Sequence, residues 1–163
     1  MGAGVAAPRG KNTPSRVARS DHLLLAFVLL CGSVGDMAIV AVINSSADTV
    51  EMLRVALQQA GFEAVTAHID EIKHGVLDFS GFLAQHDPRA VIYDIPPPYD
   101  QNWRFFQLLS TTEAMCHRTV VLTTTHKGHL EEMVGPTDAI EIVGKPYDVN
   151  KIIDAVRRGV GQG

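Results

Sequence analysis

Short apolar runs alternate with amphipathic segments from Met37 onward. The runs are brief, are bounded by polar or glycine-containing turns and fit strands buried on both faces. The predicted strands cover Ala38–Ile43, Phe62–Ala67, Ala90–Tyr93, Thr119–Leu122 and Ile140–Val143. Between and after them, apolar residues recur at helical spacing. The predicted helices cover Asp48–Ala60, Phe79–Gln85, Trp103–Leu109, His129–Val134 and Asp148–Val160.

This alternation of strands and helices is typical of βαβ units. It predicts an α/β fold, a three-layer αβα sandwich in which helices cover both faces of a doubly wound, five-stranded parallel sheet. One stretch fits less well, because Gly75 and Gly81 interrupt the residues 68–86 that must hold the second helix. We expect a loop or a partial turn there, followed by the helix that begins near Phe79.

Residues 1–36 differ in composition from the rest of the chain. A basic stretch without apolar periodicity precedes the continuous apolar run Leu23–Leu30. This order resembles a secretory signal peptide, but the run is too short for a transmembrane helix, which needs about 20 apolar residues. Because Met37 stands directly before a predicted strand, we expect residues 1–36 to be a disordered extension or a mis-assigned start. A signal segment is the less favoured alternative, and the domain is expected over residues 37–163.

Composition narrows the class of protein further. The length of 163 residues, with 46% hydrophobic residues, suits one folded domain. Fourteen basic and eighteen acidic residues give a net charge of −4, which argues against a nucleic-acid partner. Cys31 and Cys116 are too few for a disulfide scaffold or a four-cysteine zinc site. We therefore expect a reduced cytoplasmic protein without a membrane partner.

Polar residues stand at the carboxyl ends of the predicted strands. In an open α/β sheet, sites form outside these ends, near the point where the strand order reverses. The ends carry an amide, hydroxyls, one carboxylate and one amine, contributed by Asn44-Ser45, Asp94, Thr123-Thr124 and Lys145. We expect these groups to lie together at one edge of the sheet.

Residues 37–163 resemble the receiver domain of response regulators, on three motifs. Asp94, with Pro98 four residues later, looks like the phosphoacceptor segment at the end of strand three. Thr124 looks like the hydroxyl residue that ends strand four, and Lys145-Pro146-Tyr147 looks like the Lys-Pro-aromatic motif after strand five. The motifs occur in order and at the expected strand ends.

The resemblance implies a flavodoxin-like strand order 2-1-3-4-5. It also implies that Asp94 is the phosphoacceptor, that Thr124 and Lys145 contact the phosphoryl group or act in switching, and that Pro96 and Pro98 shape the site loop. In this family the Lys-Pro bond is usually cis, so we expect a cis bond between Lys145 and Pro146.

The chain departs from the family at the metal site. Receiver domains carry two acidic residues after strand one to hold Mg²⁺, and Asn44 and Ser45 stand at these positions. Mg²⁺ is held through carboxylates, phosphate and water, and it neutralises the charge that develops in phosphoryl transfer. Asp94 and the carbonyl of Pro96 alone make a poor site, so no cofactor is predicted and any Mg²⁺ binding is expected to be weak. Asp100, expected in the loop beyond the prolines, is a further carboxylate that could approach.

A second departure concerns switching. Many receiver domains carry Tyr or Phe three residues before the lysine, where this chain has Ile142. An aliphatic side chain has no polar tip with which to change partners. We therefore expect another element, such as the proline-rich loop, to transmit any signal.

Other noticeable residues have simpler interpretations. Asp94 could form a structural ion pair with Lys145 instead of accepting a phosphoryl group. His126 and His129 do not match a zinc-binding spacing, and they are expected to be surface histidines. Cys116 has no identifiable activating partner and is not expected to be a nucleophile.

The function indicated is that of an atypical, single-domain receiver of two-component (phosphorelay) type. It is expected to act through contacts with a histidine kinase, a phosphotransfer protein, a downstream target or a second copy of itself. It is not expected to be an enzyme beyond self-catalysed phosphoryl transfer onto Asp94. Two alternatives stay open: a working Mg²⁺-dependent phosphoacceptor, and a small-ligand-binding flavodoxin-like module. The second is less favoured because no glycine-rich phosphate loop follows strand one.

Overall fold

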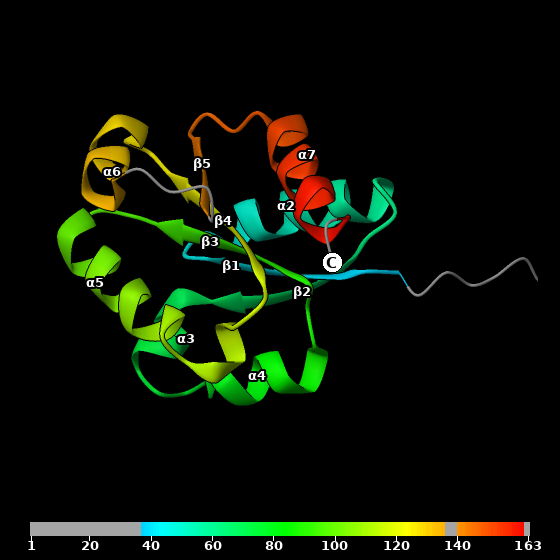
Figure 1. The fold of residues 1–163 in the computed structure, drawn as a ribbon, viewed down its shortest axis with the longest axis horizontal. Coiled ribbons are helices and arrows are strands. Elements are labelled where there is room, and N and C mark those ends of the chain that lie inside the picture. Colours follow the sequence, from blue (N-terminus) through cyan, green and yellow to red (C-terminus); the bar gives the residue numbers. More distant parts are fainter. Residues whose placement is uncertain (1–36, 136–139, 162–163) are drawn as a thin grey trace, which may run out of the picture. The chain divides into compact units, whose positions relative to one another are not determined.

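The computed structural model describes residues 37–135 and 140–161, so the interpretations of residues 1–36 lie outside the described residues. Within these ranges, five parallel strands form one sheet (Figure 1). They are β1 (Ile39–Asn44), β2 (Glu63–His68), β3 (Ala90–Ile95), β4 (Thr119–Thr124) and β5 (Ile140–Gly144). The order is β2-β1-β3-β4-β5, and every neighbouring pair is parallel. The predicted α/β class and the implied strand order 2-1-3-4-5 are both confirmed.

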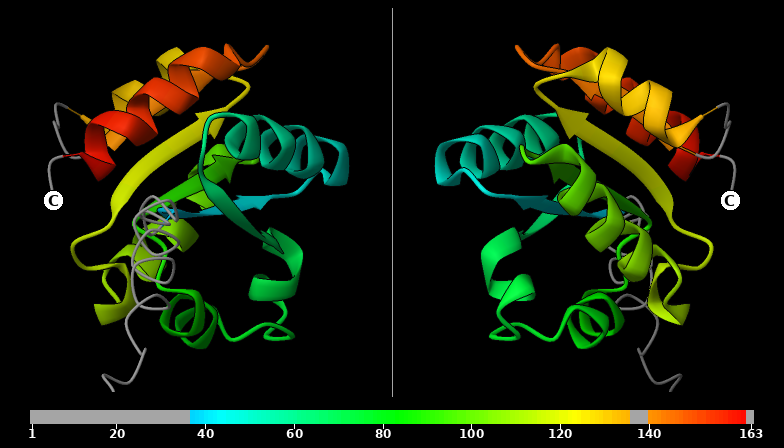
Figure 2. Two further views of the ribbon diagram at one scale, coloured as in Figure 1. Left: turned by 90° about the vertical axis from the view of Figure 1, so that its right-hand side faces the viewer. Right: turned by 90° about the vertical axis from the view of Figure 1, so that its left-hand side faces the viewer.

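Helices cover both faces of this sheet (Figures 1 and 2). One face packs against α2 (Ala47–Gln59) and α7 (Val149–Val160). The other face packs against the remaining helices, which are α3 (Ile69–Lys73), α4 (Phe79–His86), α5 (Tyr99–Ser110), the short 3₁₀ helix η1 (Glu113–Met115) and α6 (Lys127–Val134). None of the helices in the described part of the chain is long and apolar enough to cross a bilayer.

The central strands alternate between the two apolar layers. Val40 and Val42 of β1 pack in the layer under α2 and α7, whereas Ala41 and Ile43 pack in the opposite layer. Every residue of β3 is buried. Burial on both faces explains why these strands appear as continuous apolar runs rather than as alternating patterns.

The helix boundaries differ from the predicted ones where polar residues open a helix. Helix α5 begins at Tyr99, directly after Pro98 and four residues before the predicted apolar start. The ambiguous stretch 68–86 holds a short helix, α3, and then α4 from Phe79, close to the prediction. Helix α2 begins after Ser46, whose hydroxyl accepts a hydrogen bond from the backbone N–H of Thr49 at 3.3 Å. Such caps satisfy one of the free N–H groups at a helix start.

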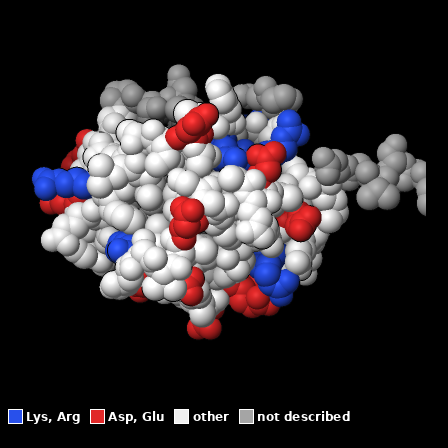
Figure 3. All heavy atoms as spheres, turned by 90° about the horizontal axis from the view of Figure 1, so that it is seen from below, with Lys and Arg blue, Asp and Glu red and all other residues white. Residues whose placement is uncertain are grey.

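The face over α3 and α4 carries charges of both signs, separated by wide uncharged areas (Figure 3). Acidic and basic side chains are interspersed on it, and the described residues of this face form no extended basic surface. The positions of interest for chemistry lie elsewhere, at the carboxyl ends of the strands.

Candidate functional site

Asp94 lies near the carboxyl end of the central strand β3, and its side chain is fully buried (0% exposed). Side chains alternate along a strand, so Asp94 points to the same sheet face as Ile92, the face covered by α2 and α7. On the neighbouring strands, Thr123 of β4 is its register partner, and Asn44 of β1 comes directly after Ile43, which pairs with Tyr93. The fold thus gathers an amide, a carboxylate and a hydroxyl side by side.

Three side chains donate hydrogen bonds to the Asp94 carboxylate. The Thr123 hydroxyl donates to Oδ1 at 2.8 Å, and the Tyr147 hydroxyl donates to the same oxygen at 3.3 Å. Lys145 Nζ donates to Oδ2 at 3.1 Å and forms an ion pair with it. Both carboxylate oxygens are therefore engaged, and the buried charge has a cation beside it. A buried carboxylate without such partners is strongly destabilising.

Tyr147 links this carboxylate to the end of β1. Asn44 Nδ2 donates to the Tyr147 hydroxyl at 3.3 Å, and Asn44 Oδ1 accepts from the backbone N–H of Ser46 at 2.9 Å. The Ser46 contact fixes which end of the amide faces Tyr147. Ser45, by contrast, is exposed. Asn44 stands at one of the two positions where receiver domains carry a metal-binding acid. Here its side chain holds the Tyr147 hydroxyl instead.

Lys145 is held by backbone and side-chain contacts. Its backbone N–H donates to the carbonyl of Thr124 at 2.7 Å, and its Nζ lies 5.2 Å from the centre of the Tyr147 ring. Burial lowers the pKa of Lys145, but the hydrogen bond with Tyr147 and the charge of Asp94 outweigh it, so the net pKa lies above the ordinary value. The lysine remains a cation next to the carboxylate. The Lys145–Pro146 bond is cis, which confirms that expectation.

The hydroxyl that reaches Asp94 belongs to Thr123, one residue before the predicted Thr124. In the sheet, Asp94 is the register partner of Thr123, whereas Thr124 pairs with Ile95. Thr124 is buried, and its hydroxyl accepts a hydrogen bond from the backbone N–H of His126 at 3.3 Å. Strand alternation places these two threonines on opposite faces. The structure therefore brings Asn44, Asp94 and Lys145 together but turns the Thr124 hydroxyl toward the loop after β4.

The loop after β3 is tied down by residues that the sequence did not single out. Asn102 of α5 is buried, and its Nδ2 donates to the carbonyl of Pro96 at 2.7 Å. Its Oδ1 accepts from Lys73 Nζ of α3 at 2.5 Å. The loop continues through a second cis bond, between Pro97 and Pro98, into α5. These contacts fix the proline loop on the side of α3 and α5.

The residues around Asp94 do not fit a Mg²⁺ ion. Mg²⁺ takes oxygen ligands, whereas the groups nearest the carboxylate are an ammonium and two hydroxyls that donate to it. Asp100 lies in the first turn of α5 and not in the loop where we expected it; it is exposed, with Oδ1 3.9 Å from His129 Nε2. In residues 37–135 and 140–161, no group of three His, Cys, Asp or Glu residues is placed to hold a metal.

A second contact joins the two loops beside the site. The Tyr99 hydroxyl and Thr125 Oγ1 are 2.5 Å apart, so the start of α5 is linked to the residues after β4. The rings of His126 and His129 lie 6.1 and 5.6 Å from the Tyr99 ring. Ile142, at the position where many receiver domains carry an aromatic residue, is partly buried against the apolar layer under α5 and α6.

Comparison with known proteins identifies the fold. No protein-family model matches the chain, and no curated protein sequence matches it significantly. Solved structures do match. A structure titled as a transiently phosphorylated "switch" in bacterial signal transduction has a TM-score of 0.59 at 21% identity, and the match covers 77% of this chain and 95% of the other.

Two further structures have the same fold. The chemotaxis protein CheY4 of Vibrio cholerae has a TM-score of 0.56 at 21% identity, over 75% of this chain and 98% of the other. A response regulator receiver protein from Sinorhizobium medicae has a TM-score of 0.57 at 19% identity, over 77% and 96%. At these identities the likeness establishes that the described residues, 37–135 and 140–161, have the fold of these proteins.

Proposed function

We propose that residues 37–163 form an atypical receiver domain of two-component type, in which an internal polar network replaces the metal. The observation that carries the proposal is the set of contacts at Asp94, which joins Lys145, Thr123 and Tyr147 to one fully buried carboxylate. A histidine kinase, a phosphotransfer protein, a downstream target or a second copy of the chain would be its partner, in the cytoplasm.

The receiver part of the proposal rests on where the charged groups lie. Asp94 is near the carboxyl end of β3, and Lys145 follows β5 and reaches across β4 to pair with it at 3.1 Å. The same arrangement is what the resemblance implies for the phosphoacceptor and its lysine. Fold alone does not fix function, and these two residues are what extend the likeness from the fold to the site.

The metal-free part rests on Asn44 and Tyr147. Asn44 brings no charge to the end of β1, and its amide donates to the Tyr147 hydroxyl, which in turn donates to Asp94. An arrangement of donors around the carboxylate stabilises the negative charge without a cation other than Lys145. The domain then signals through its surface and its conformation, and a phosphoryl group is not required.

An intact-mass experiment tests this proposal. The protein is incubated with acetyl phosphate and Mg²⁺, beside an Asp94→Asn variant, a metal-free sample and an ordinary receiver domain. We expect the ordinary receiver to gain one phosphoryl group and this chain to gain none. A phosphoryl group that depends on both Mg²⁺ and Asp94 would contradict the proposal.

That contrary result would favour the second candidate, a working phosphoacceptor. One observation supports this candidate, because Lys145 and a hydroxyl, that of Thr123, already lie next to the carboxylate and could contact a phosphoryl group on Oδ1 or Oδ2. Mg²⁺ would then have to displace the Tyr147 hydroxyl or enter from the side of the exposed Ser45. A phosphoryl group gained with Mg²⁺ and absent from the metal-free control distinguishes this candidate from the first.

A further inference from the structure

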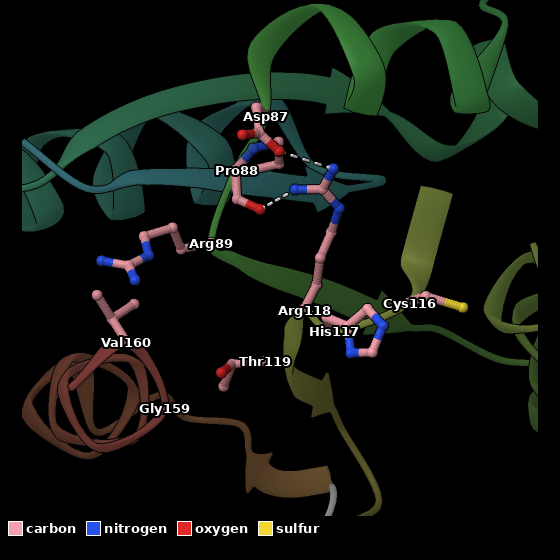
Figure 4. Close-up of a pocket in the computed structure, with 9 residues that line it drawn as sticks. All are labelled: Asp87, Pro88, Arg89, Cys116, His117, Arg118, Thr119, Gly159 and Val160. Atoms are coloured by element: carbon pink, nitrogen blue, oxygen red, sulfur yellow. Dashed lines mark hydrogen bonds and ion pairs between the residues drawn. The ribbon is translucent and has the colours of Figure 1, made fainter. Parts of the chain in front are cut away.

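A hollow of about 260 Å³ lies at the opposite end of the sheet from Asp94, where β3 and β4 begin (Figure 4). Its walls come from the residues before β3, the residues before β4 and the last turn of α7. None of the side chains that contact Asp94 lines it. Arg89, Arg118 and Thr119 surround it in Figure 4, with Val160 of α7 beside Arg89.

One wall holds a guanidinium in a fixed position. Arg118 Nε donates to the carbonyl of Ala114 at 2.5 Å, Nη2 donates to the carbonyl of Leu83 at 3.4 Å, and Nη1 donates to the carbonyl of Pro88. The side chain is only 13% exposed. Because so many contacts hold it, this cation keeps its place whether or not a ligand is present.

The charge of Arg118 is only weakly compensated. Among the residues that the structure describes, its acidic partner is Asp87, at 3.1 Å, and the side chain of Asp87 is 89% exposed. Water screens such an exposed partner strongly. A buried cation with a screened partner leaves a positive potential on the side of the hollow.

Arg89 adds a second positive charge. Its backbone is anchored in the sheet, since its N–H donates to Ile39 at 2.9 Å and its carbonyl accepts from the N–H of Thr119 at 3.1 Å. No acidic side chain among residues 37–135 and 140–161 lies within ion-pairing distance of its guanidinium. The side chain is exposed, and Figure 4 shows its guanidinium directed away from Arg118, so its N–H donors reach an anion in the hollow only after this side chain turns.

We propose that this hollow binds the phosphate group of a small phosphorylated compound or inorganic phosphate. Arg89 would supply the hydrogen bonds, because a free guanidinium binds phosphate oxygens through paired N–H donors. Arg118 would contribute mainly its charge, since most of its N–H groups are committed to carbonyls and to Asp87. The volume lies below the range of pockets that enclose whole drug-sized ligands, about 300–1,000 Å³, so the hollow suits a phosphate group and not an entire nucleotide. This site is separate from the Asp94 network, and the inference does not depend on the proposed function.

A nuclear magnetic resonance titration of the full chain with inorganic phosphate tests the site. Sodium chloride at the same ionic strength serves as the blank. We expect saturable shifts of the backbone amides of Arg89, Arg118 and Thr119. Glycerol phosphate forms a second arm: tighter binding than inorganic phosphate assigns the site to phosphate esters, and equal or weaker binding assigns it to the free ion.

Three variants sharpen the test. Arg89→Gln removes the available cation but keeps the backbone anchors, and we expect about tenfold weaker binding, the size expected for loss of a charge-assisted contact. Arg104→Gln, at an exposed position on α5 outside the hollow, is the matched control and should leave the affinity unchanged. Asp87→Asn removes a competing negative charge and should strengthen binding.

Three results would overturn the inference. The first is shifts no larger than those in the chloride blank. The second is equal affinity of the Arg89→Gln variant and the original chain. The third is shifts at Asn44, Thr123 and Tyr147 in place of those around the hollow, which would put the anion at the other end of the sheet.

Discussion

The phenol hydroxyl of Tyr147 donates to Oδ1 of Asp94 at 3.3 Å, although the two residues are 53 positions apart in the chain. The same hydroxyl accepts from Asn44 Nδ2 at 3.3 Å. Tyr147 therefore connects the loop after β5 with the ends of β1 and β3.

Removing this hydroxyl should weaken the domain. In Tyr147→Phe, Asp94 loses one donor and Asn44 loses its acceptor, so we expect the free energy of unfolding to fall by about 1–3 kcal/mol. Urea denaturation followed by circular dichroism measures the change. The matched control is Tyr99→Phe, whose hydroxyl contact with Thr125 is exposed and should matter less. Equal losses of unfolding free energy in the two variants would show that the Tyr147 hydroxyl stabilises the fold no more than an exposed hydroxyl does.

Stability should decline at alkaline pH. The pKa of Lys145 is raised in the folded state, as described above, and burial, followed by the charge of Asp94, raises the pKa of Tyr93. A raised folded pKa adds stability that is complete below the unfolded pKa, about 10 for both residue types, and that is lost as the pH rises through the folded value. Urea unfolding between about pH 8 and pH 11 should show this decline, with a shallower slope in Tyr93→Phe. An unchanged slope in that variant would contradict the assignment to Tyr93.

Introducing the acidic pair of receiver domains should create a metal site. In the Asn44→Asp/Ser45→Asp double variant, a second carboxylate replaces a donor near Asp94, and like charges at close range are unfavourable. We expect a loss of about 1–3 kcal/mol in unfolding free energy without metal, recovery in millimolar Mg²⁺, and phosphorylation by acetyl phosphate. Urea unfolding and intact mass measure these effects.

The single variant Ser45→Asp is the control for this experiment, because Ser45 is exposed and a charge there should change stability little. If Mg²⁺ does not stabilise the double variant, the strand ends lack the geometry of a receiver metal site. That result would weaken the proposal that this domain is an atypical receiver.

Arg118 should be essential for stability. Its guanidinium donates to the carbonyls of Leu83, Pro88 and Ala114. Arg118→Met would remove all three contacts, although the Leu83 carbonyl would keep the backbone N–H of Asp87. We expect the free energy of unfolding to fall by about 2–4 kcal/mol. Arg104→Met, at an exposed position of α5, should change it by less than about 0.5 kcal/mol. A small effect at Arg118, measured by the same urea titration, would show that backbone contacts alone hold the start of β4.

Gly159 should not tolerate a side chain. A Cβ at this position of α7 would overlap the side chain of Thr119 at the start of β4. We expect Gly159→Ala to cost about 1–3 kcal/mol through overpacking. Thr119→Ala should recover part of this cost in the double variant, so a double-mutant cycle should give a clear coupling energy. Strict additivity would contradict direct contact between the two residues.

The sequence predicted the central strands β1, β3 and β4 well because they are largely apolar and almost completely buried. It also predicted that Asn44, Asp94 and Lys145 would meet, since parallel strands bring their carboxyl ends to one edge. It did not distinguish Thr123 from Thr124, because that choice depends on the register between β3 and β4 and no local pattern sets it. Because Thr123, Thr124 and Thr125 follow one another, a hydroxyl would face Asp94 in either register, and the sequence does not show which one it is.

Contacts between distant helices were beyond prediction for a similar reason. The link from Lys73 through Asn102 to the Pro96 carbonyl joins α3, α5 and the loop after β3. In the sequence alone, Lys73 and Asn102 look like ordinary polar residues on the surface of a helix. Tyr147 carried a weak signal, because a phenol directly after the Lys-Pro pair adds a polar tip beside a predicted carboxylate.

During synthesis, Asp94 is made before the residues that pair with it. A ribosome completes Asp94 long before it adds Lys145 and Tyr147, which supply the cation and one of the donors for that carboxylate. Until those later residues emerge, β3 can be buried only with an uncompensated charge at its end, which is strongly unfavourable. The nascent sheet therefore cannot reach its final stability strand by strand, and assembly of the domain is completed only when the chain beyond β5 is free to close over Asp94.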